Sequence, residues 1–388
     1  MSLFSSSVDW TFPVPIHYGP GRLSELSLMC ISNDIFRPLI VTDRGSVDLP
    51  FVSLVKKILG NAGLSFDLFS DVSPNPIDKE ILIGKEVYKN GQHDGIIAIG
   101  GGSGMDAGKA ISLIALNEFD LWQFDNDKAK TPTTKEFPPL ICIPTTAGTG
   151  AETESTAMIT NSALGMKLCV WHPNQKPIIA LLDPTLSFDL PRSLTAWTGV
   201  DAIVHAVEAY TVDSLYSVAD AMAIQSLSLL GPNLIKATNN PHDLEARGAM
   251  LIGSCLAGIS FLKGLGLVHA ISHMVGAIYD TQHGLTNAIL LPPVLRFNKS
   301  SIAHKIKVMN YSTFSSAEGS EDFYTNICNL LDELEIPKNL YELKVDSQKS
   351  SEIASKAMKD SAARTNPRQA NIDELKLLVS EAINDARC

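Results

Sequence analysis

Features typical of secreted, membrane-bound and disulfide-stabilised proteins are missing from this chain. Its six cysteines are scattered through 388 residues without a Cys-x-x-Cys pair, so neither a disulfide framework nor a zinc–thiolate site is expected. It has no uninterrupted apolar run of about eighteen residues and no basic amphipathic helix. The N-terminal segment lacks a basic region followed by an apolar one, so no signal peptide is expected. These absences predict a cytoplasmic protein that does not bind a membrane.

Charge and composition narrow the class further. The formal net charge is −11 at pH 7, which argues against nucleic acid as a partner because phosphates require a basic surface. The chain is 45% hydrophobic and 19% charged, which is enough apolar material for sizeable cores and no sign of disorder. A length of 388 residues suggests two domains.

Three histidines stand out in the apolar segment 264–284, namely His269, His273 and His283. Imidazoles are uncommon in apolar segments unless they are paired, hydrogen-bonded or bound to a metal. His269 and His273 are four positions apart and therefore share one face of a helix. A turn before His283 would let the chain bring the third imidazole back toward the other two. The segment is therefore either a metal or proton-transfer site or a set of satisfied core histidines.

A second group of ionisable residues lies in the apolar helix predicted over 195–212. Asp201, His205 and Glu208 occupy positions i, i+4 and i+7, which form a single stripe on that helix. A buried carboxylate needs a strong partner. One carboxylate and one imidazole from this stripe, with two imidazoles from 264–284, would complete a ligand set for a divalent ion with one position open. The alternative is an Asp201–His205 ion pair with unrelated core histidines.

The first half of the chain alternates predicted strands and helices, and its strand ends carry cofactor-binding signals. Gly100-Gly101-Gly102-Ser103-Gly104 follows the strand 95–99 and opens a helix near Met105, as in loops whose N–H groups approach a pyrophosphate. A tight turn without a ligand is the alternative. Asp43 ends the strand 38–43, where a carboxylate can accept hydrogen bonds from a ribose or cap the next helix.

A second polar loop follows the predicted strand 139–144. It begins Thr145-Thr146-Ala147-Gly148-Thr149 and offers hydroxyl and N–H groups at another strand end. Ligands of open α/β sheets bind at the carboxyl ends of strands, so the two loops support each other. A strand pair is expected over 157–161 and 166–171, with Lys167 at the start of its second strand.

The composition changes near residues 185–192, which predicts an α/β dinucleotide-binding domain over 1–188 and an all-helical domain over 189–388. The helices expected in the second domain are 193–212, 215–237, 243–262, 265–279, 285–298, 301–310, 321–334 and a tail over 349–386.

With these residues in view, nearly the whole chain resembles the iron-containing alcohol dehydrogenase family. The motifs that carry the resemblance are VTD at 41–43, SPNP at 73–76, GGGSGMDAGKA at 100–110, PTTAGTGAE at 144–152, GVDAIVHAVEAY at 199–210, GLGLVHAISH…HG over 264–284 and TNPR at 365–368. Their order and spacing together are highly specific.

The resemblance implies a Rossmann-like N-terminal domain, an all-α C-terminal domain and an active site in the cleft between them. It implies that the metal ligands are Asp201, His205, His269 and His283, and that His273 is a proton relay near the nicotinamide. It also implies cofactor contacts from Gly101, Gly102, Ser103, Thr145, Thr146, Thr149 and Lys167, with Asp43 favouring NAD over NADP. The expected metal is Fe²⁺, with Zn²⁺ or another divalent ion possible. Family members commonly form homodimers or higher homo-oligomers.

The implied activity is hydride transfer between NAD(H) and a primary alcohol or aldehyde, since a divalent ion lowers the pKa of a hydroxyl and polarises a carbonyl. The chain departs from the family pattern at Ser260, where a bulky Phe is frequent, and at Lys263. Ser260 would admit a longer substrate, and Lys263 could face an acidic group on it. Alternatively, Lys263 points to solvent or pairs with an acid such as Glu154. A dehydroquinate-synthase-like lyase and a metal- or nucleotide-binding sensor are the competing functions.

Overall fold

The computed structural model describes residues 14–128, 130–134, 136–315 and 322–387. The described residues divide into two compact units. One unit comprises residues 14–146 and 150–189, and the other comprises residues 147–149 and 190–387. Apart from the short 147–149 segment, the chain passes from the first unit to the second after Asp189.

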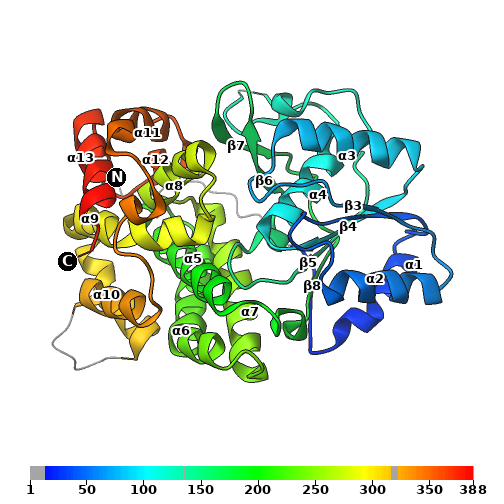
Figure 1. Ribbon diagram of the computed structural model, residues 1–388, viewed down its shortest axis with the longest axis horizontal. Helices are drawn as coiled ribbons and strands as arrows, with labels where there is room; N and C mark the ends of the chain where they lie inside the picture. The colour runs from blue at the N-terminus through cyan, green and yellow to red at the C-terminus, as the bar shows by residue number, and fades with distance from the viewer. Residues whose placement is uncertain (1–13, 129, 135, 316–321, 388) are drawn as a thin grey trace. The chain divides into compact units, whose positions relative to one another are not determined.

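A parallel sheet forms the centre of the first unit (Figure 1). It has six strands in the order β1-β8-β5-β4-β2-β3. Its strands are β1 (Ile16–Tyr18), β2 (Pro38–Val41), β3 (Asp67–Phe69), β4 (Gly95–Gly100), β5 (Leu140–Pro144) and β8 (Ile179–Leu182). All residues of β2, β4, β5 and β8 are buried, as expected for parallel strands covered on both faces. The predicted α/β class of this domain is confirmed.

Helices cover both faces of the sheet because successive strand residues point to opposite sides. Ile97 and Ile99 of β4 pack in one core with α1 (Leu26–Ile31) and α2 (Pro50–Asn61). Ile96 and Ala98 pack in the other core with α3 (Asp78–Asn90) and α4 (Gly102–Ala115). An antiparallel hairpin, β6 (Thr156–Asn161) and β7 (Met166–Trp171), packs on this second side. The helix α1 was not predicted from the sequence.

The strand order places the predicted cofactor residues together. β2, β4 and β5 are neighbours and run parallel, so their carboxyl ends lie at one edge of the sheet. Asp43 follows β2, Gly101 follows β4, and Thr145 follows β5. From β2 the chain first adds β3 on one side and then crosses back to add β4 on the other side. The direction in which strands are added to the sheet therefore reverses between β2 and β4. A reversal of this kind is where ligands bind in open α/β sheets.

The second unit is helical, as predicted. Its helices are α5 (Arg192–Thr211), α6 (Ser217–Asn239), α7 (Leu244–Ser260), α8 (Leu267–Tyr279), α9 (His283–Phe314), α10 (Phe323–Glu333), α11 (Ser350–Ala357), α12 (Ser361–Thr365) and α13 (Ile372–Asn384). Helix α5 packs against α6, α7 and α9. Fifteen of its residues are buried, which explains why its sequence is apolar on nearly every side.

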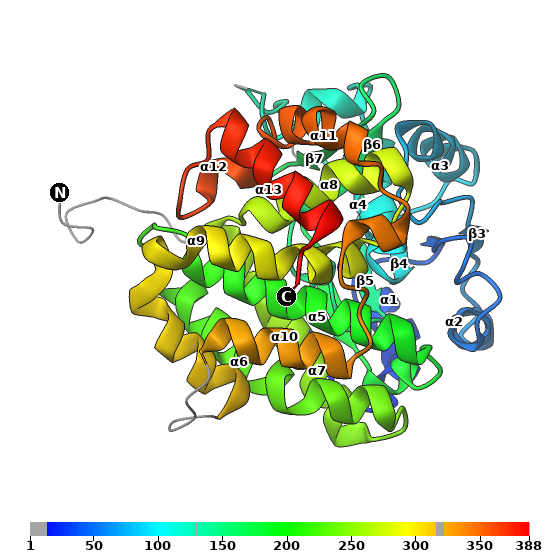
Figure 2. The ribbon, with the colours of Figure 1, turned by 60° about the vertical axis from the view of Figure 1, so that its left-hand side comes forward.

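Two helix predictions were wrong at their boundaries. The segments 285–298 and 301–310 form one continuous helix, α9 (Figure 2). The polar Asn298 at the expected break is buried and hydrogen-bonded to Asn366. The tail over 349–386 is three helices. Asp360 caps α12 through the N–H of Ala362, and Pro367 holds the preceding residue in an extended conformation after α12 ends.

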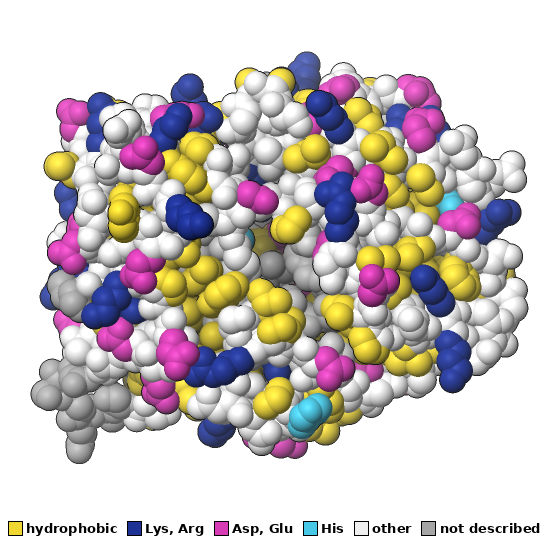
Figure 3. Space-filling view, in the orientation of Figure 1, with side chains coloured by type: hydrophobic (Ala, Val, Ile, Leu, Met, Phe, Trp, Pro, Cys, Tyr) yellow, Lys and Arg dark blue, Asp and Glu magenta, His cyan; other side chains and the backbone are white. Residues whose placement is uncertain are grey.

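Two segments, Ser217–Asn239 and Leu244–Lys263, are long and apolar enough to cross a membrane by length and composition alone, although polar and charged residues interrupt both. Each packs against α5 within the helical unit, where apolar residues of both are buried. Of the apolar windows of the two segments, 67% of Leu244–Lys263 and 33% of Ser217–Asn239 is buried, so packing inside this unit accounts mainly for the first. On the face drawn in Figure 3, acidic and basic side chains of the described residues are interspersed with uncharged ones.

Candidate metal centre and cofactor loops

Four side chains of the helical unit converge on one point. Asp201, His205, His269 and His283 each direct one ligand atom into a cluster in which all four atoms lie within 4.8 Å of one another. Oδ1 of Asp201 lies 4.0 Å from Nδ1 of His205, 4.0 Å from Nε2 of His269 and 3.8 Å from Nε2 of His283. The structure therefore brings together the complete set of predicted ligands.

Three helices supply these ligands. Asp201 and His205 lie one turn apart on α5, His269 lies in the first turn of α8, and His283 is the first residue of α9. Asp201, His205 and His269 are almost fully buried. Residues 280–282, between α8 and α9, reverse the chain direction so that His283 faces His269. The centroids of the two rings lie 5.4 Å apart.

The chemistry of the cluster fits a divalent ion. Nδ1 of His205 is buried and has no hydrogen-bond partner among the described residues. Burial lowers the pKa of His205 to about 4, so its imidazole is neutral near pH 7. A neutral imidazole with a free lone pair is the form that binds a metal. One carboxylate and three imidazoles are a common donor set for iron and zinc.

Glu208 fixes the orientation of His269. Its carboxylate lies 2.7 Å from Nδ1 of His269 and accepts the N–H groups of Gly266 and Val268 at 2.9 and 2.7 Å. A Cβ atom on Gly266 would lie 2.7 Å from Oε1 of Glu208, so only glycine allows this approach. Since Nδ1 of His269 is used by Glu208, its Nε2 is left to face the cluster. The sequence placed Glu208 on the correct face but gave it no role.

Asn287 was missed by sequence reasoning although it lies at the centre of the site. Its Nδ2 is 2.6 Å from Oδ1 of Asp201 and 3.1 Å from Nε2 of both His269 and His283. The side chain is fully buried and lies one helical turn after His283. That four-residue spacing from a predicted ligand was the available signal.

His273 lies beside the cluster without belonging to it. Its ring stacks on that of His283, with centroids 5.6 Å apart, and its Nδ1 is 2.8 Å from Oδ2 of Asp360. Asp360 was not predicted as a site residue, and it lies 87 positions away in the sequence. Its place just before TNPR, as a helix-capping Asp, was the only available signal. The pair orients His273 so that Nε2 is the nitrogen that can exchange a proton.

In the α/β unit, the residues predicted to bind a cofactor lie around the ends of β2, β4 and β5. Oδ2 of Asp43 accepts hydrogen bonds from the hydroxyls of Ser46 and Ser103, the latter at 3.3 Å. Gly100 has φ of 141°, which favours glycine, and leads directly into Gly101 and α4. The helix begins at Gly102, earlier than predicted, so Gly102 and Ser103 present N–H groups of its first turn.

A backbone hydrogen bond connects the loop that follows β5 to the loop that follows β4. The N–H of Thr145 donates to the carbonyl of Gly100 at 2.9 Å, and a Cβ atom on Gly101 would lie 3.6 Å from Cγ2 of Thr146. Lys167, on β7, donates to Oδ1 of Asn75 at 3.3 Å. Thr149 belongs to the short 147–149 segment grouped with the helical unit.

The two residues predicted to contact substrate have structural partners. The hydroxyl of Ser260 is fully buried and donates to the carbonyl of Ala257 at 2.7 Å. The ammonium of Lys263 lies 2.5 Å from Oδ1 of Asp220 and its side chain is 1% exposed. Its anionic partner is thus Asp220, whereas the sequence suggested Glu154.

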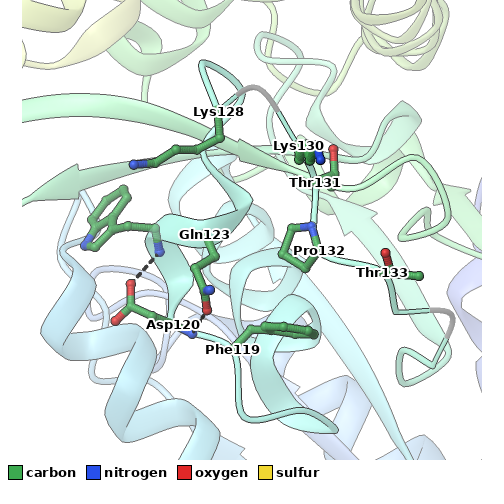
Figure 4. A pocket seen from close by; sticks show the side chains of 9 residues that line it. Phe119, Asp120, Gln123, Lys128, Lys130, Thr131, Pro132 and Thr133 are labelled. Carbon is green, nitrogen blue, oxygen red and sulfur yellow. Dashed lines mark hydrogen bonds between the residues drawn. The ribbon is translucent and has the colours of Figure 1, made fainter.

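The α/β unit also contains a pocket, whose lining side chains are drawn in Figure 4. It is lined by the segment around Trp122, whose backbone N–H donates to Asp120 at 2.8 Å, by Lys128 and by residues 130–133. None of the predicted site residues lines it.

Comparison with known proteins matches both halves of the chain to one family. Residues 13–184 match the iron-containing alcohol dehydrogenases, and residues 195–383 match the C-terminal part of the Fe-containing alcohol dehydrogenase family. The chain belongs to the iron-containing alcohol dehydrogenase family. This confirms the resemblance seen in the sequence.

Similar proteins agree over nearly the full length. The NAD-dependent methanol dehydrogenase of Bacillus methanolicus is 34% identical, over 94% of this chain and 97% of that protein. The 1,3-propanediol dehydrogenase of Klebsiella pneumoniae is 33% identical, over 96% and 98%. The crystal structure of a 1,3-propanediol oxidoreductase superposes with a TM-score of 0.92 at 33% identity, covering 97% of this chain and all of that one. This family member is an NAD-dependent alcohol dehydrogenase with a divalent-metal site formed by Asp201, His205, His269 and His283.

Proposed function

We propose that this alcohol dehydrogenase interconverts short primary alcohols and their aldehydes with NAD(H). The observation that carries the proposal is the convergence of Asp201, His205, His269 and His283 within 4.8 Å. Methanol and 1,3-propanediol, named for the two relatives described above, are both small primary alcohols.

The four ligands would hold the ion, and a bound divalent ion supplies Lewis acidity that lowers a hydroxyl pKa or polarises a carbonyl. The protein contributes by keeping the donors in place. Glu208 holds His269, and Ser272 lies 3.0 Å from Nδ1 of His283, so each of these two imidazoles keeps Nε2 toward the cluster. Fe²⁺ is the metal we propose, with Zn²⁺ as the alternative for the same donor set.

The cofactor would be bound by the loops of the α/β unit. Gly101, Gly102 and Ser103 supply first-turn N–H groups of α4 for the pyrophosphate, where the positive end of the helix dipole also lies. Thr145, Thr146, Thr149 and Lys167 complete the predicted contacts. Asp43, at the end of the neighbouring strand, accepts hydrogen bonds from the ribose hydroxyls and repels a 2′-phosphate.

His273 is the proposed proton relay. Its Nδ1 is hydrogen-bonded to Asp360, which also accepts the N–H of Ala362. That bond fixes the ring, so a proton is gained or lost at Nε2.

We also propose that the protein is cytoplasmic and forms a homodimer or higher homo-oligomer, in keeping with the free cysteines of the described residues and with the family. The substrate itself is proposed as neutral. Because the ammonium of Lys263 is bonded to Asp220, a carboxylated substrate has weaker support than it had from the sequence.

The test is NADH oxidation by metal-free protein reconstituted separately with Fe²⁺ and Zn²⁺, using short neutral aldehydes and their ω-carboxylated counterparts. The proposal expects turnover of the neutral aldehydes that depends on metal and is lost in His269→Ala. A preference for the carboxylated aldehydes would overturn the proposed substrate class. Absence of turnover with every primary aldehyde, despite bound metal and NADH, would overturn the proposed reaction.

A further inference from the structure

A group of charged side chains lies beneath the loop at residues 100–104, called the glycine loop, and outside the metal centre. Lys109, on α4, is completely buried, and its ammonium donates to the carbonyl oxygens of Ala151, at 2.8 Å, and Thr156. Oδ1 of Asp106, one helical turn earlier, lies 3.3 Å from the same ammonium. Three oxygens therefore surround one desolvated cation. Burying an ammonium is costly, so a fold that retains one compensates it with several strong contacts.

The contacts of Lys109 and Asp106 join segments that are distant in the sequence. Ala151 lies just after the loop that follows β5, residues 145–149, called the threonine loop. Thr156 is the first residue of β6. Oδ2 of Asp106 accepts the N–H of Met158, on β6, at 3.2 Å. Two adjacent turns of α4 are thus bonded to the far end of the threonine loop and to the strand after it. At its near end, the same loop is bonded to the end of β4 through Thr145 and Gly100.

The ammonium stays charged in this setting. Burial lowers the pKa of Lys109, but the nearby carboxyl groups, Asp106 first among them, outweigh that effect and the pKa is raised. A permanently charged donor holds carbonyl groups more strongly than a neutral one. Its loss would leave the carbonyls of Ala151 and Thr156 without this donor, and the segment between them would shift.

We propose that Lys109 is a positioning residue for cofactor binding: it ties α4 to Ala151 and Thr156 and so holds the glycine loop and the threonine loop in the arrangement that receives NAD. The inference rests on the proposed role of these two loops as the cofactor site. It goes further by assigning affinity for NAD to a residue that lies beneath the loops and is buried away from solvent.

The chain offers a matched control for loss of a buried lysine. Lys85, on α3, is also buried, and its ammonium donates to the carbonyl of Asn117 at 3.0 Å. That carbonyl lies in neither of the two loops. Lys85→Met therefore removes a bond from a buried ammonium to a carbonyl in the same unit. It leaves intact the contacts of Lys109 with Ala151 and Thr156, which we call the clamp. Lys85→Met thus reports what loss of a buried ammonium from this unit does to NADH affinity when neither loop is involved.

The experiment measures NADH affinity by fluorescence titration of the full-length, metal-loaded protein. Lys109→Met is expected to weaken NADH binding about tenfold or more, and Lys85→Met less than about twofold. Metal affinity and the turnover number at saturating NADH are expected to change little in Lys109→Met. Equal weakening in the two lysine variants, or none in Lys109→Met, would overturn the proposal.

Ser103→Glu separates this inference from the assignment of the loops. Ser103 is in the first turn of α4, where a carboxylate favours the helix but repels a pyrophosphate. If Ser103→Glu leaves NADH affinity intact, the proposed cofactor site is wrong, and the role of Lys109 falls with it. If Ser103→Glu weakens binding and Lys109→Met does not, only the clamp is wrong.

A second variant covers the case in which Lys109→Met does not fold. Asp106→Asn keeps an oxygen to accept the N–H of Met158 but removes the charge that faces Lys109. It is expected to weaken NADH binding about threefold, in the same direction as Lys109→Met. An affinity equal to that of the unmodified protein would count against the clamp.

Discussion

Oε2 of Glu208 and Nδ1 of His269 lie 2.7 Å apart, and the two residues come from the buried faces of α5 and α8. The same carboxylate accepts two N–H groups at the start of α8, where the positive end of the helix dipole favours an anion. One buried side chain therefore caps a helix, fixes a tautomer and presents Nε2 to the ligand cluster. The metal site is built into the helix packing and does not depend on a flexible loop for this ligand.

Glu208→Gln tests this relationship. A glutamine amide facing Nδ1 can donate a hydrogen bond to it, which favours the tautomer with hydrogen on Nε2 and removes the lone pair needed for ligation. We expect metal affinity to fall about 10–100-fold, the range found for such supporting residues. Competition with a chromophoric chelator for Co²⁺ or Zn²⁺ measures this directly.

The matched control is Asp360→Asn, which alters another buried carboxylate bonded to a histidine Nδ1. Because His273 is not a ligand, this variant should keep the metal affinity of the unmodified protein while reducing turnover. Equal metal affinity in Glu208→Gln and Asp360→Asn would show that orientation of His269 by Glu208 is unimportant.

Asp43→Gly addresses cofactor choice. The Asp43 carboxylate lies at the end of β2 beside Ser103, and its negative charge is the proposed barrier to a 2′-phosphate. The variant should raise kcat/KM with NADPH relative to NADH by about tenfold or more, since removing a repulsive charge is worth over ~1 kcal/mol. Steady-state kinetics with both cofactors give the ratio, and an unchanged ratio would remove Asp43 from the cofactor site.

Lys263→Ala addresses the acidic substrate suggested by the sequence. The ammonium is paired with Asp220, so its charge is already balanced within the helical unit. We expect the ranking of neutral and ω-carboxylated aldehydes to remain the same, with any loss appearing in thermal stability. Specific loss of activity on the carboxylated aldehydes would instead place Lys263 in the substrate site, and Asp220→Asn would then be expected to enhance that activity.

The residues that sequence reasoning placed correctly share a local signature. Asp201 and His205 are one helical turn apart in an apolar helix, so their common face follows from helix geometry alone. Glycines after an apolar strand similarly located the loop at Gly100–Gly102, because φ of 141° at Gly100 requires glycine. The parallel sheet was evident from strands that are apolar throughout.

The residues that were missed owe their roles to contacts distant in sequence. Asp360 reaches His273 across 87 positions, and Asn366 accepts the N–H of Leu267 across 99. No local pattern distinguishes such an Asp or Asn from a surface turn residue. The same reason explains the false break in α9, where a buried amide pair with Asn366 turned a polar Asn298 into a core residue.

Glu154→Gln tests the buried charges around Lys109 through their pH dependence. Burial raises the pKa of Glu154 from 4.5 to about 7, despite the opposing effect of Lys109. Between these two values the folded protein binds more protons than the unfolded chain, so its stability falls as pH rises. The glutamine amide in the variant does not titrate, so the variant should gain stability relative to the unmodified protein between pH 5 and pH 8, on the order of 2 kcal/mol.

Urea unfolding at the two pH values measures that difference. Glu118→Gln serves as the control because Glu118 is exposed and its pKa is lowered by a hydrogen bond from Lys89, so its removal should give no such gain. A stability difference between Glu154→Gln and the unmodified protein that is the same at pH 5 and pH 8 would mean that Glu154 ionises as freely in the folded state as in the unfolded chain. The cluster beneath the glycine loop would then hold Lys109 with two ionised neighbours, Asp106 and Glu154, instead of one.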